Sequence, residues 1–140
     1  MGNGKGFTLI ELMLVVVIIG VLVSMVAPRL AGRSEEARIA AARADINANI
    51  SVALDLYELD NGKYPETEEG LAALLAKPDS VVKWKGPYIK KVPLDPWGKS
   101  YVYRSPGDHN IDYDLYSYGP DRQEGGEDNV SNWEIEYAEE

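Results

Sequence analysis

The segment from Phe7 to Ala27 is an apolar run of 21 residues whose only charged side chain belongs to Glu11. A helix of this length crosses the hydrocarbon core of a bilayer, so we interpret the segment as a membrane-inserted helix. Lys5 is the only charged side chain before this run and places the start of the chain on the cytoplasmic face. No Ala-x-Ala site separates the run from Pro28, so cleavage after the run, as in an ordinary secretory signal, is not expected.

Glu11 is the most informative residue of this run, since a carboxylate inside an apolar membrane helix costs roughly 2 to 4 kcal/mol. Two interpretations follow from the residues alone. The carboxylate reaches the lipid headgroups from near the helix end, or it has a specific partner within an assembly.

The composition excludes several classes of function. A net charge of −9 without a basic stripe argues against a nucleic-acid partner. The chain has no cysteine and therefore no disulfide. The stability that disulfides give other small domains must come here from a metal ion, from packing against sister subunits, or from both. Its single histidine, His109, lies in a Gly-Asp-His-Asn turn with no Walker loop or acid-base pair, so we predict a solvated turn residue and no enzyme activity.

A second helical pattern runs from Ser34 to Asp60, where apolar residues share one face. Because no linker separates it from the apolar run, we predict one long helix that ends at Asn61-Gly62. Gly20, Pro28 and Gly32 are the points where that helix could kink, which the sequence leaves open. The predicted core face comprises Ile39, Ala42, Ile46, Ile50, Ala53, Leu54 and Tyr57.

The rest of the chain is broken by prolines and glycines into short segments. We predict a short helix after Thr67 that continues through Ala76, and three or four short antiparallel strands packed on the long helix, which is an α+β fold. The turn Leu94-Asp95-Pro96-Trp97-Gly98 is suited to burying its indole. The expected strands are Tyr88–Lys90, Ser100–Arg104, Leu115–Tyr118 and Trp133–Tyr137.

The loop from Tyr118 to Asn129 combines carboxylates with a Gly-Gly pair. Glycines allow a loop to turn its carbonyl oxygens inward, and calcium takes six to eight oxygen ligands in flexible geometry. The spacing is not that of an EF-hand. From composition alone the loop is either solvated or a site for a hard cation.

The sequence Gly6-Phe7-Thr8-Leu9-Ile10-Glu11, followed by an aliphatic run, resembles the processing site of type IV pilins and type II secretion pseudopilins. The resemblance implies that a prepilin peptidase cuts between Gly6 and Phe7 on the cytoplasmic side and methylates the amino group of Phe7. It also implies that Glu11 pairs with the Phe7 amine of a neighbouring subunit, which would set the register of a filament.

Later blocks are similar to the major pseudopilin family of type II secretion and occur in that family's order: ARADINANISVALDLYELDNGKYP, TEEGLAALL, GPYIKKVPLDPWGKSYVYRSPG and DYDLYSYGPDRQEGGEDNVSNW. The missing cysteine pair separates the chain from most type IV pilins. The resemblance implies a pilin-like fold: a cleaved leader at 1–6, a transmembrane and filament-core helix at 7–30, and a periplasmic domain at 31–140 with a small C-terminal antiparallel sheet.

The family also binds calcium in the corresponding loop, so the resemblance implies calcium here. The side chains of Asp121 and Asp128 are expected as ligands, while Glu124 and Glu127 stay at the rim. The full expected set is Tyr118, Asp121, Gln123, Gly126, Asp128 and Asn129, with Tyr118 and Gln123 contributing carbonyl oxygens.

The implied function is that of the main subunit of a periplasmic pseudopilus that drives export of folded proteins across the outer membrane. Its implied partners are copies of itself, minor pseudopilins, the inner-membrane assembly platform and the prepilin peptidase. The chain would sit in the inner membrane with a cytoplasmic N-terminus before it enters the filament. The alternatives are a type IV pilin for adhesion or motility and a membrane-anchored periplasmic binding domain that never polymerises.

Overall fold

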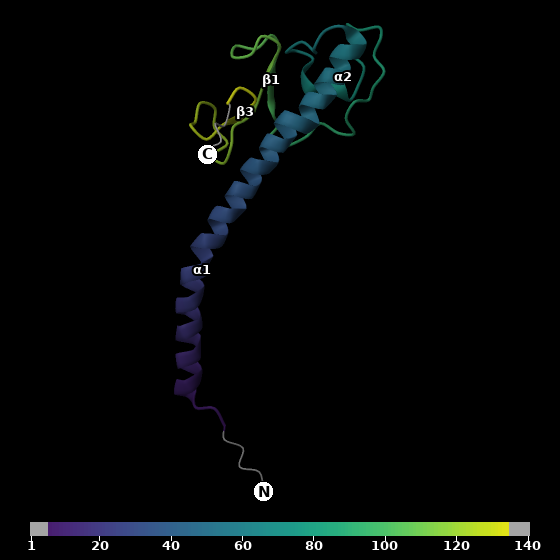
Figure 1. Ribbon diagram of the computed structural model, residues 1–140. Coiled ribbons are helices and arrows are strands. Elements are labelled where there is room, and N and C mark those ends of the chain that lie inside the picture. The colour runs from purple at the N-terminus through teal and green to yellow at the C-terminus, as the bar shows by residue number, and fades with distance from the viewer. Residues whose placement is uncertain (1–5, 135–140) are drawn as a thin grey trace. The chain divides into compact units, whose positions relative to one another are not determined.

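The computed structural model describes residues 6–134, apart from the side chains of residues 27–31. The chain forms two compact units, Met1–Glu36 and Ala37–Glu140. It is helical without a break from Leu9 to Asn61, through α1 (Leu9–Ala44), the π-helix η1 (Asp45–Ile50) and α2 (Ser51–Asn61) (Figure 1). The predicted continuous helix is therefore confirmed. The division of the chain at residue 30 stays a prediction.

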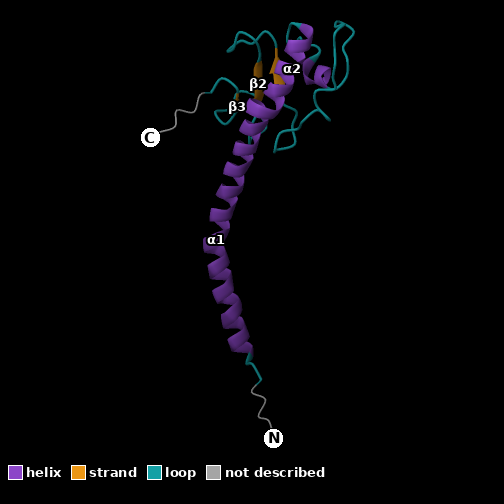
Figure 2. Cartoon of the chain, turned by 45° about the vertical axis from the view of Figure 1, so that its right-hand side comes forward, coloured by secondary structure: helices purple, strands orange, loops and turns teal. Residues whose placement is uncertain are grey.

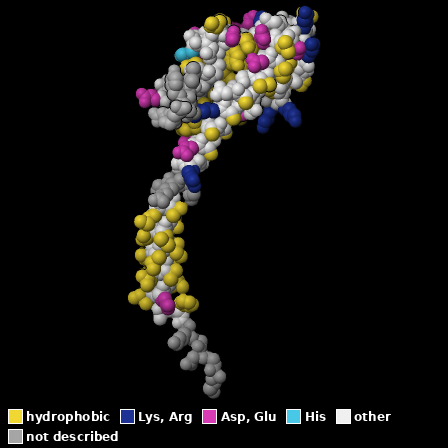
Figure 3. Space-filling view, in the orientation of Figure 1, with side chains coloured by type: hydrophobic (Ala, Val, Ile, Leu, Met, Phe, Trp, Pro, Cys, Tyr) yellow, Lys and Arg dark blue, Asp and Glu magenta, His cyan; other side chains and the backbone are white. Residues whose placement is uncertain are grey.

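The first unit contains the apolar part of α1. Its stretch Leu9–Val26 is long and apolar enough to cross a membrane, and none of it is buried within the chain. Hydrophobic side chains cover the visible face of this stretch in Figure 3. An apolar surface of this extent is not stable in water, so the segment requires lipid or other helices around it.

The core of the second unit forms on one face of the helix, as the periodicity predicts. Ile46, Leu54 and Tyr57 have no exposed surface, and Ile39 is partly buried against the same cluster. The helix ends where expected, because Gly62 adopts a left-handed conformation with φ of 80° and donates its N–H to the carbonyl of Glu58 at 2.6 Å.

The π-helix η1 was not predicted. It lies in the middle of the predicted core face and still buries Ile46 and Ile50. The carboxylate of Asp45 accepts hydrogen bonds from the hydroxyl of Tyr101 at 2.9 Å and from the amide of Asn49 at 2.8 Å. Burial and the bond to Asp45 both raise the pKa of Tyr101, so its hydroxyl stays protonated and acts as a donor at neutral pH.

Three short strands form an antiparallel sheet in the order β1-β2-β3. Figure 2 draws the strands in orange. They are β1 (Val102–Arg104), β2 (Asp114–Ser117) and β3 (Val130–Ser131). Tyr103 pairs with Leu115, and Ser117 pairs with Val130. The predicted α+β class and antiparallel sheet are confirmed. Trp97 is buried in its turn, also as predicted.

Two of the strand predictions are wrong. Tyr88–Lys90 is a bend, because the N–H groups of Tyr88 and Ile89 both point to the carbonyl of Leu74 and so cannot join a ladder. Trp133 is not in a strand either, and the third strand is Val130–Ser131 instead. Residues 135–137 of the expected last strand lie outside the described residues.

The predicted helix after Thr67 is shorter than expected. The structure has a single 3₁₀ helix there, η2 (Gly70–Leu74). The hydroxyl of Thr67 does not cap it, because it donates to the carbonyl of Ser105 and accepts from the Ser105 N–H, both at 3.0 Å. Thr67 thus ties this turn to the end of β1.

Candidate functional site

The predicted processing and assembly residues lie at the start of α1. Gly6 and Phe7 precede the first helical residue, and the Phe7 side chain is exposed. Thr8 is the N-cap, since its carbonyl accepts the first helical hydrogen bond, from the N–H of Leu12 at 3.2 Å. The bond that a peptidase would cut is therefore outside the helix.

Glu11 and Thr8 form a reciprocal capping box. The N–H of Glu11 donates to the hydroxyl of Thr8 at 3.3 Å, and the N–H of Thr8 points to a carboxylate oxygen of Glu11 at 3.5 Å. Within a single subunit, the carboxylate therefore satisfies a backbone donor of its own helix. The Thr-x-x-Glu spacing is the sequence signal of this capping box, which neither of the two interpretations of Glu11 above includes.

All six predicted calcium ligands lie on one loop, residues 118–129, which connects β2 to β3. Its carboxylates are tied to its own backbone. The N–H of Gln123 donates to Asp121 Oδ1 at 2.8 Å, and the N–H of Asp121 donates to Asp128 Oδ2 at 3.2 Å. The side chains of Glu124 and Glu127 are exposed.

Gly126 shows that the two carboxylates converge. A Cβ at this position would fall 2.4 Å from Asp128 Oδ1 and 2.9 Å from Asp121 Oδ2. Both carboxylates therefore face the same side of Gly126, and only glycine leaves that space open. Within residues 6–134, no group of three or more His, Cys, Asp or Glu side chains is placed to hold a metal ion. A cation here would need carbonyl or amide oxygens in addition to the two carboxylates.

Asn129 supplies a further oxygen. Its Oδ1 is buried and has no hydrogen-bond partner. A buried polar atom without a partner costs about 1–3 kcal/mol, so this oxygen is suited to a ligand that compensates for the loss. Carboxylate, amide and carbonyl oxygens are the ligand types that calcium takes, so the residues of this loop could hold such an ion.

Gly119 and Ser117 hold the start of this loop. Gly119 has φ of 75°, and a Cβ on it would lie 2.0 Å from the carbonyl oxygen of Asp128, so glycine is required where the two ends of the loop meet. The buried hydroxyl of Ser117 donates to Asp95 Oδ2 at 2.6 Å and accepts the N–H of Gly119 at 3.0 Å. These three residues were not among the predicted site residues.

His109 lies in an exposed turn, as the sequence predicts, but its side chain also makes contacts that were not predicted. Its side chain is half-exposed, but Nδ1 lies 3.0 Å from Oδ2 of the buried Asp114. Its ring stacks on that of Trp133, with centroids 4.0 Å apart. No sequence signal links these three residues, because their contacts depend on the conformation of the turn before β2.

Comparisons with known proteins match the chain along most of its length. The family model for type II secretion system (T2SS) protein G matches residues 29–133, and that for the prokaryotic N-terminal methylation motif matches residues 1–27. The type II secretion system core protein G of Pseudomonas aeruginosa is 48% identical over 137 residues, which cover 93% of this chain and 95% of that protein. Its counterpart in Vibrio cholerae is 47% identical over 142 residues, covering 97% and 96%.

A solved structure is also similar. The crystal structure of the major pseudopilin from the type 2 secretion system of enterohaemorrhagic Escherichia coli matches with a TM-score of 0.68 and 36% sequence identity. The match covers 79% of this chain and 95% of that one.

Proposed function

The chain belongs to the type II secretion system protein G family and is a pseudopilus subunit, and on that premise we propose that it polymerises with copies of itself and that growth of the filament drives export of folded proteins across the outer membrane. The observation that carries the proposal is the fully exposed apolar stretch Leu9–Val26. It requires lipid before assembly and sister helices afterwards. Exchange of lipid contacts for helix contacts is then the step that adds a subunit.

The family is a structural one, and the proposed role is mechanical. Before assembly, the subunit sits in the inner membrane with its N-terminus in the cytoplasm and its second unit in the periplasm. The proposed partners are the prepilin peptidase, which cuts between Gly6 and Phe7 and methylates Phe7, the inner-membrane assembly platform and the minor pseudopilins. Head-to-tail contacts between identical subunits naturally give an open helical filament.

The processing proposal is tested by intact mass after coexpression with a prepilin peptidase. We expect the loss of Met1 to Gly6 and the gain of one methyl group. An uncut chain would support a simple membrane anchor instead. Restored secretion in a bacterium that lacks its own protein G then tests the export role, and a filament that forms without restoring secretion would point to a type IV pilin.

We also propose that the loop of residues 118–129 binds calcium. The convergence of Asp121 and Asp128 at Gly126 and the unpartnered oxygen of Asn129 support this. Tyr118 and Gln123, through their carbonyl oxygens, and Gly126 complete the proposed ligand set. Bound calcium would neutralise the two carboxylates and tie both ends of the loop together in place of a disulfide.

The calcium proposal is tested with Gly126→Ala, because the added methyl group occupies the space between the carboxylates. We expect calcium affinity to fall by at least about tenfold, since the carboxylates cannot both face one ion. Isothermal titration calorimetry on the full chain in detergent micelles measures this. Gln123→Ala is the matched control, because it retains the carbonyl oxygen. A wild-type melting curve that neither calcium nor a chelator shifts would contradict the proposal.

A further inference from the structure

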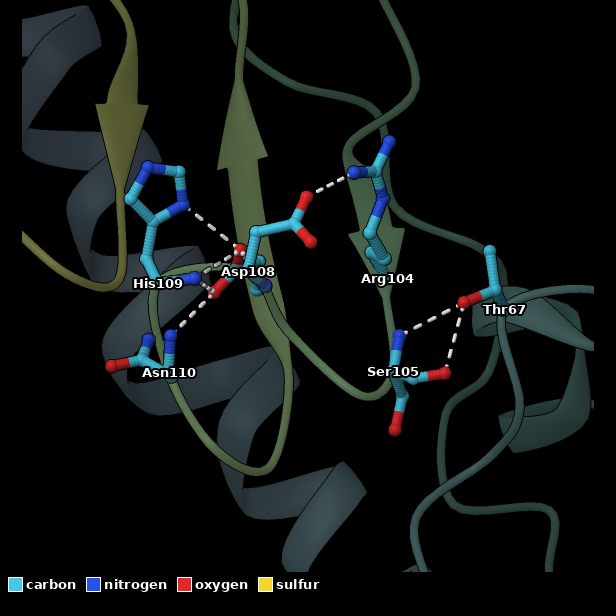
Figure 4. Close-up of polar contacts among 7 residues, drawn as sticks. Thr67, Arg104, Ser105, Asp108, His109 and Asn110 are labelled. Carbon is cyan, nitrogen blue, oxygen red and sulfur yellow. Dashed lines mark hydrogen bonds and ion pairs between the residues drawn. The ribbon is translucent and has the colours of Figure 1, made fainter.

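The turn that precedes β2 is built around one buried carboxylate. Asp114 accepts the backbone N–H groups of Asp108 at 2.8 Å, His109 at 3.0 Å and Asn110 at 2.9 Å. His109 Nδ1 lies 3.0 Å from Oδ2 of the same carboxylate, the distance at which Nδ1–H donates a hydrogen bond to it. Figure 4 shows His109 and Asn110 with dashed lines for their hydrogen bonds. The backbone and the imidazole of His109 are thereby both fixed.

The fixed imidazole supports Trp133. The two rings are parallel, with an interplanar angle of 2° and centroids 4.0 Å apart. Trp133 also packs edge to face on the ring of Tyr116, with ring centroids 5.4 Å apart and an interplanar angle of 70°. We call His109 and Trp133 the ring clamp. It joins the turn before β2 to the chain that follows β3.

The chain after β3 needs such support, because β3 makes only two pairs with β2. The side chain of Asn132 adds two bonds, to the N–H of Leu115 at 3.0 Å and the carbonyl of Tyr113 at 3.1 Å. The candidate ligands Asp128 and Asn129 come directly before this short strand. Any shift of the strand therefore shifts two of the six candidate ligands.

The ring clamp also faces the loop itself. A groove of about 310 Å³ has His109, Tyr116 and Trp133 among its lining residues. The same groove is lined from the loop by Glu124, Gly125 and Asn129. Because no other side chain of residues 6–134 fills this space, loss of the imidazole would enlarge it and remove the parallel stack that supports Trp133.

We propose that His109 is a positioning residue for the calcium loop: through its stack on Trp133 it holds the chain after β3 so that Asp128 and Asn129 meet Asp121. His109 is not itself a ligand. The proposal deepens the calcium proposal above and rests on it. Outer residues that orient metal ligands typically contribute on the order of 10- to 100-fold in affinity, although they never touch the ion.

The test compares five full-length chains in detergent micelles by calorimetric titration with calcium chloride: wild type, His109→Ala, His109→Gln, His109→Phe and Ile111→Ala. We expect His109→Ala to bind calcium on the order of tenfold more weakly. His109→Phe retains a flat ring to stack on Trp133 and is expected to bind as wild type does. Ile111→Ala changes an exposed side chain in the same turn and is the matched control.

Melting of each chain in chelator, followed by tryptophan fluorescence, separates positioning from general stability. We expect His109→Gln, which keeps a donor for Asp114, to melt near the wild-type temperature without metal while its calcium affinity falls. His109→Ala also loses the bond to Asp114 and should melt at a lower temperature. If His109→Ala fails to fold, His109→Gln alone carries the test, since glutamine offers Asp114 a donor but provides no ring, and it must show the same loss of affinity.

Two outcomes overturn the proposal, and they differ from failure of the calcium proposal. Unchanged affinity in a folded variant without the ring contradicts the positioning role alone. Equal losses in His109→Ala and His109→Phe contradict the stacking mechanism. A wild-type chain that does not bind calcium contradicts the calcium proposal itself, and the positioning role fails with it.

Discussion

Single carboxylates organise the turns of the second unit by accepting backbone N–H groups. Asp95 accepts from Trp97 at 3.1 Å and Lys99 at 2.7 Å, and Asp121 accepts from Gln123 at 2.8 Å. Asp114 does the same for three consecutive residues. Hydrogen bonds to an ionised acceptor are about twice as strong as neutral ones, which suits a small domain that has no disulfide.

Asp114 gives a prediction about stability and pH. Burial alone would raise the pKa of this carboxyl, but the hydrogen bonds from Asn110, His109 and Asp108 outweigh burial and hold the pKa below its usual value of 3.8. A lowered pKa contributes stability that is complete above the unfolded value and disappears as the pH falls through the folded one. Asp114→Asn should therefore destabilise the domain by about 1–3 kcal/mol at pH 7.

The measurement is urea unfolding followed by tryptophan fluorescence at pH 7 and at pH 3 or below. The difference in the free energy of unfolding between wild type and Asp114→Asn should be smaller at the lower pH, because the wild-type carboxyl then loses its charge. Asp112→Asn is the control, since Asp112 is exposed in the same turn. A difference of the same size at both pH values would contradict the role of the charge.

At this scale, sequence reasoning located residues whose chemistry is unusual for their surroundings. Glu11 in an apolar run and the Asp-rich, Gly-rich loop are of this kind. It did not find Asp114 or Ser117, because an aspartate or a serine before a turn is common and its bonds depend on the loop conformation. It placed His109 in a turn correctly but missed the ring on which it stacks.

Among the elements, the helix was predicted along its whole length, whereas only two of the four expected strands, Ser100–Arg104 and Leu115–Tyr118, correspond to strands of the structure. Seven apolar residues on one helical face define the core contact over more than five turns, whereas the strands hold only two to four residues each. A strand this short has no periodicity of its own. Where such a strand begins and ends depends on the hydrogen bonds that neighbouring segments make. The expected strand Tyr88–Lys90 does not form because the N–H groups of Tyr88 and Ile89 bond to the carbonyl of Leu74.

The π-helix η1 leads to a prediction about deletions. A π-turn holds one residue more than an α-turn, so removal of one residue from it can leave a regular α-helix. The helical segments before and after the deletion would then keep the same sides turned toward the core. Deletion of the exposed Asn47 should therefore be tolerated, with a melting temperature near that of wild type. Ile46 and Ile50 would both stay in the core.

The matched control is deletion of the exposed Val52 from the regular helix α2. There the loss of one residue rotates one flank by about 100° relative to the other. Ala53 and Leu54 could then not both stay in the core together with Ile50. The free energy of unfolding should fall by about 2–5 kcal/mol, as it does when a buried aliphatic side chain is truncated to alanine. Thermal melts by tryptophan fluorescence measure both variants, and equal losses in the two would contradict this account of η1.

At the scale of the whole molecule, the two units differ in where their apolar side chains lie. The second unit buries its own core, while the apolar stretch of the first unit buries nothing within the chain. The sequence predicts this division directly, because an apolar run of 21 residues cannot belong to the core of so small a domain. In a filament, sister helices would cover the apolar stretch while the second unit keeps its own core. The one charged side chain of the stretch, Glu11, then also needs a partner.

Glu11 therefore gives the prediction that tests the assembly itself. In the single subunit its carboxylate caps its own helix through Thr8, and in the filament we propose that it pairs with the Phe7 amine of a neighbour. A buried carboxylate without a partner is strongly unfavourable, so only the correct stagger of subunits is stable. Glu11→Ala should be inserted and processed normally but form filaments at least about tenfold less well.

Glu11→Gln separates the two roles of the side chain. Glutamine can still accept the N–H of Thr8, but it carries no charge for the amine. If pairing sets the register, Glu11→Gln should assemble as poorly as Glu11→Ala when sheared filaments are quantified and intact mass confirms processing. Wild-type assembly of Glu11→Gln would instead assign Glu11 to the capping box alone, and wild-type assembly of Glu11→Ala would remove both roles.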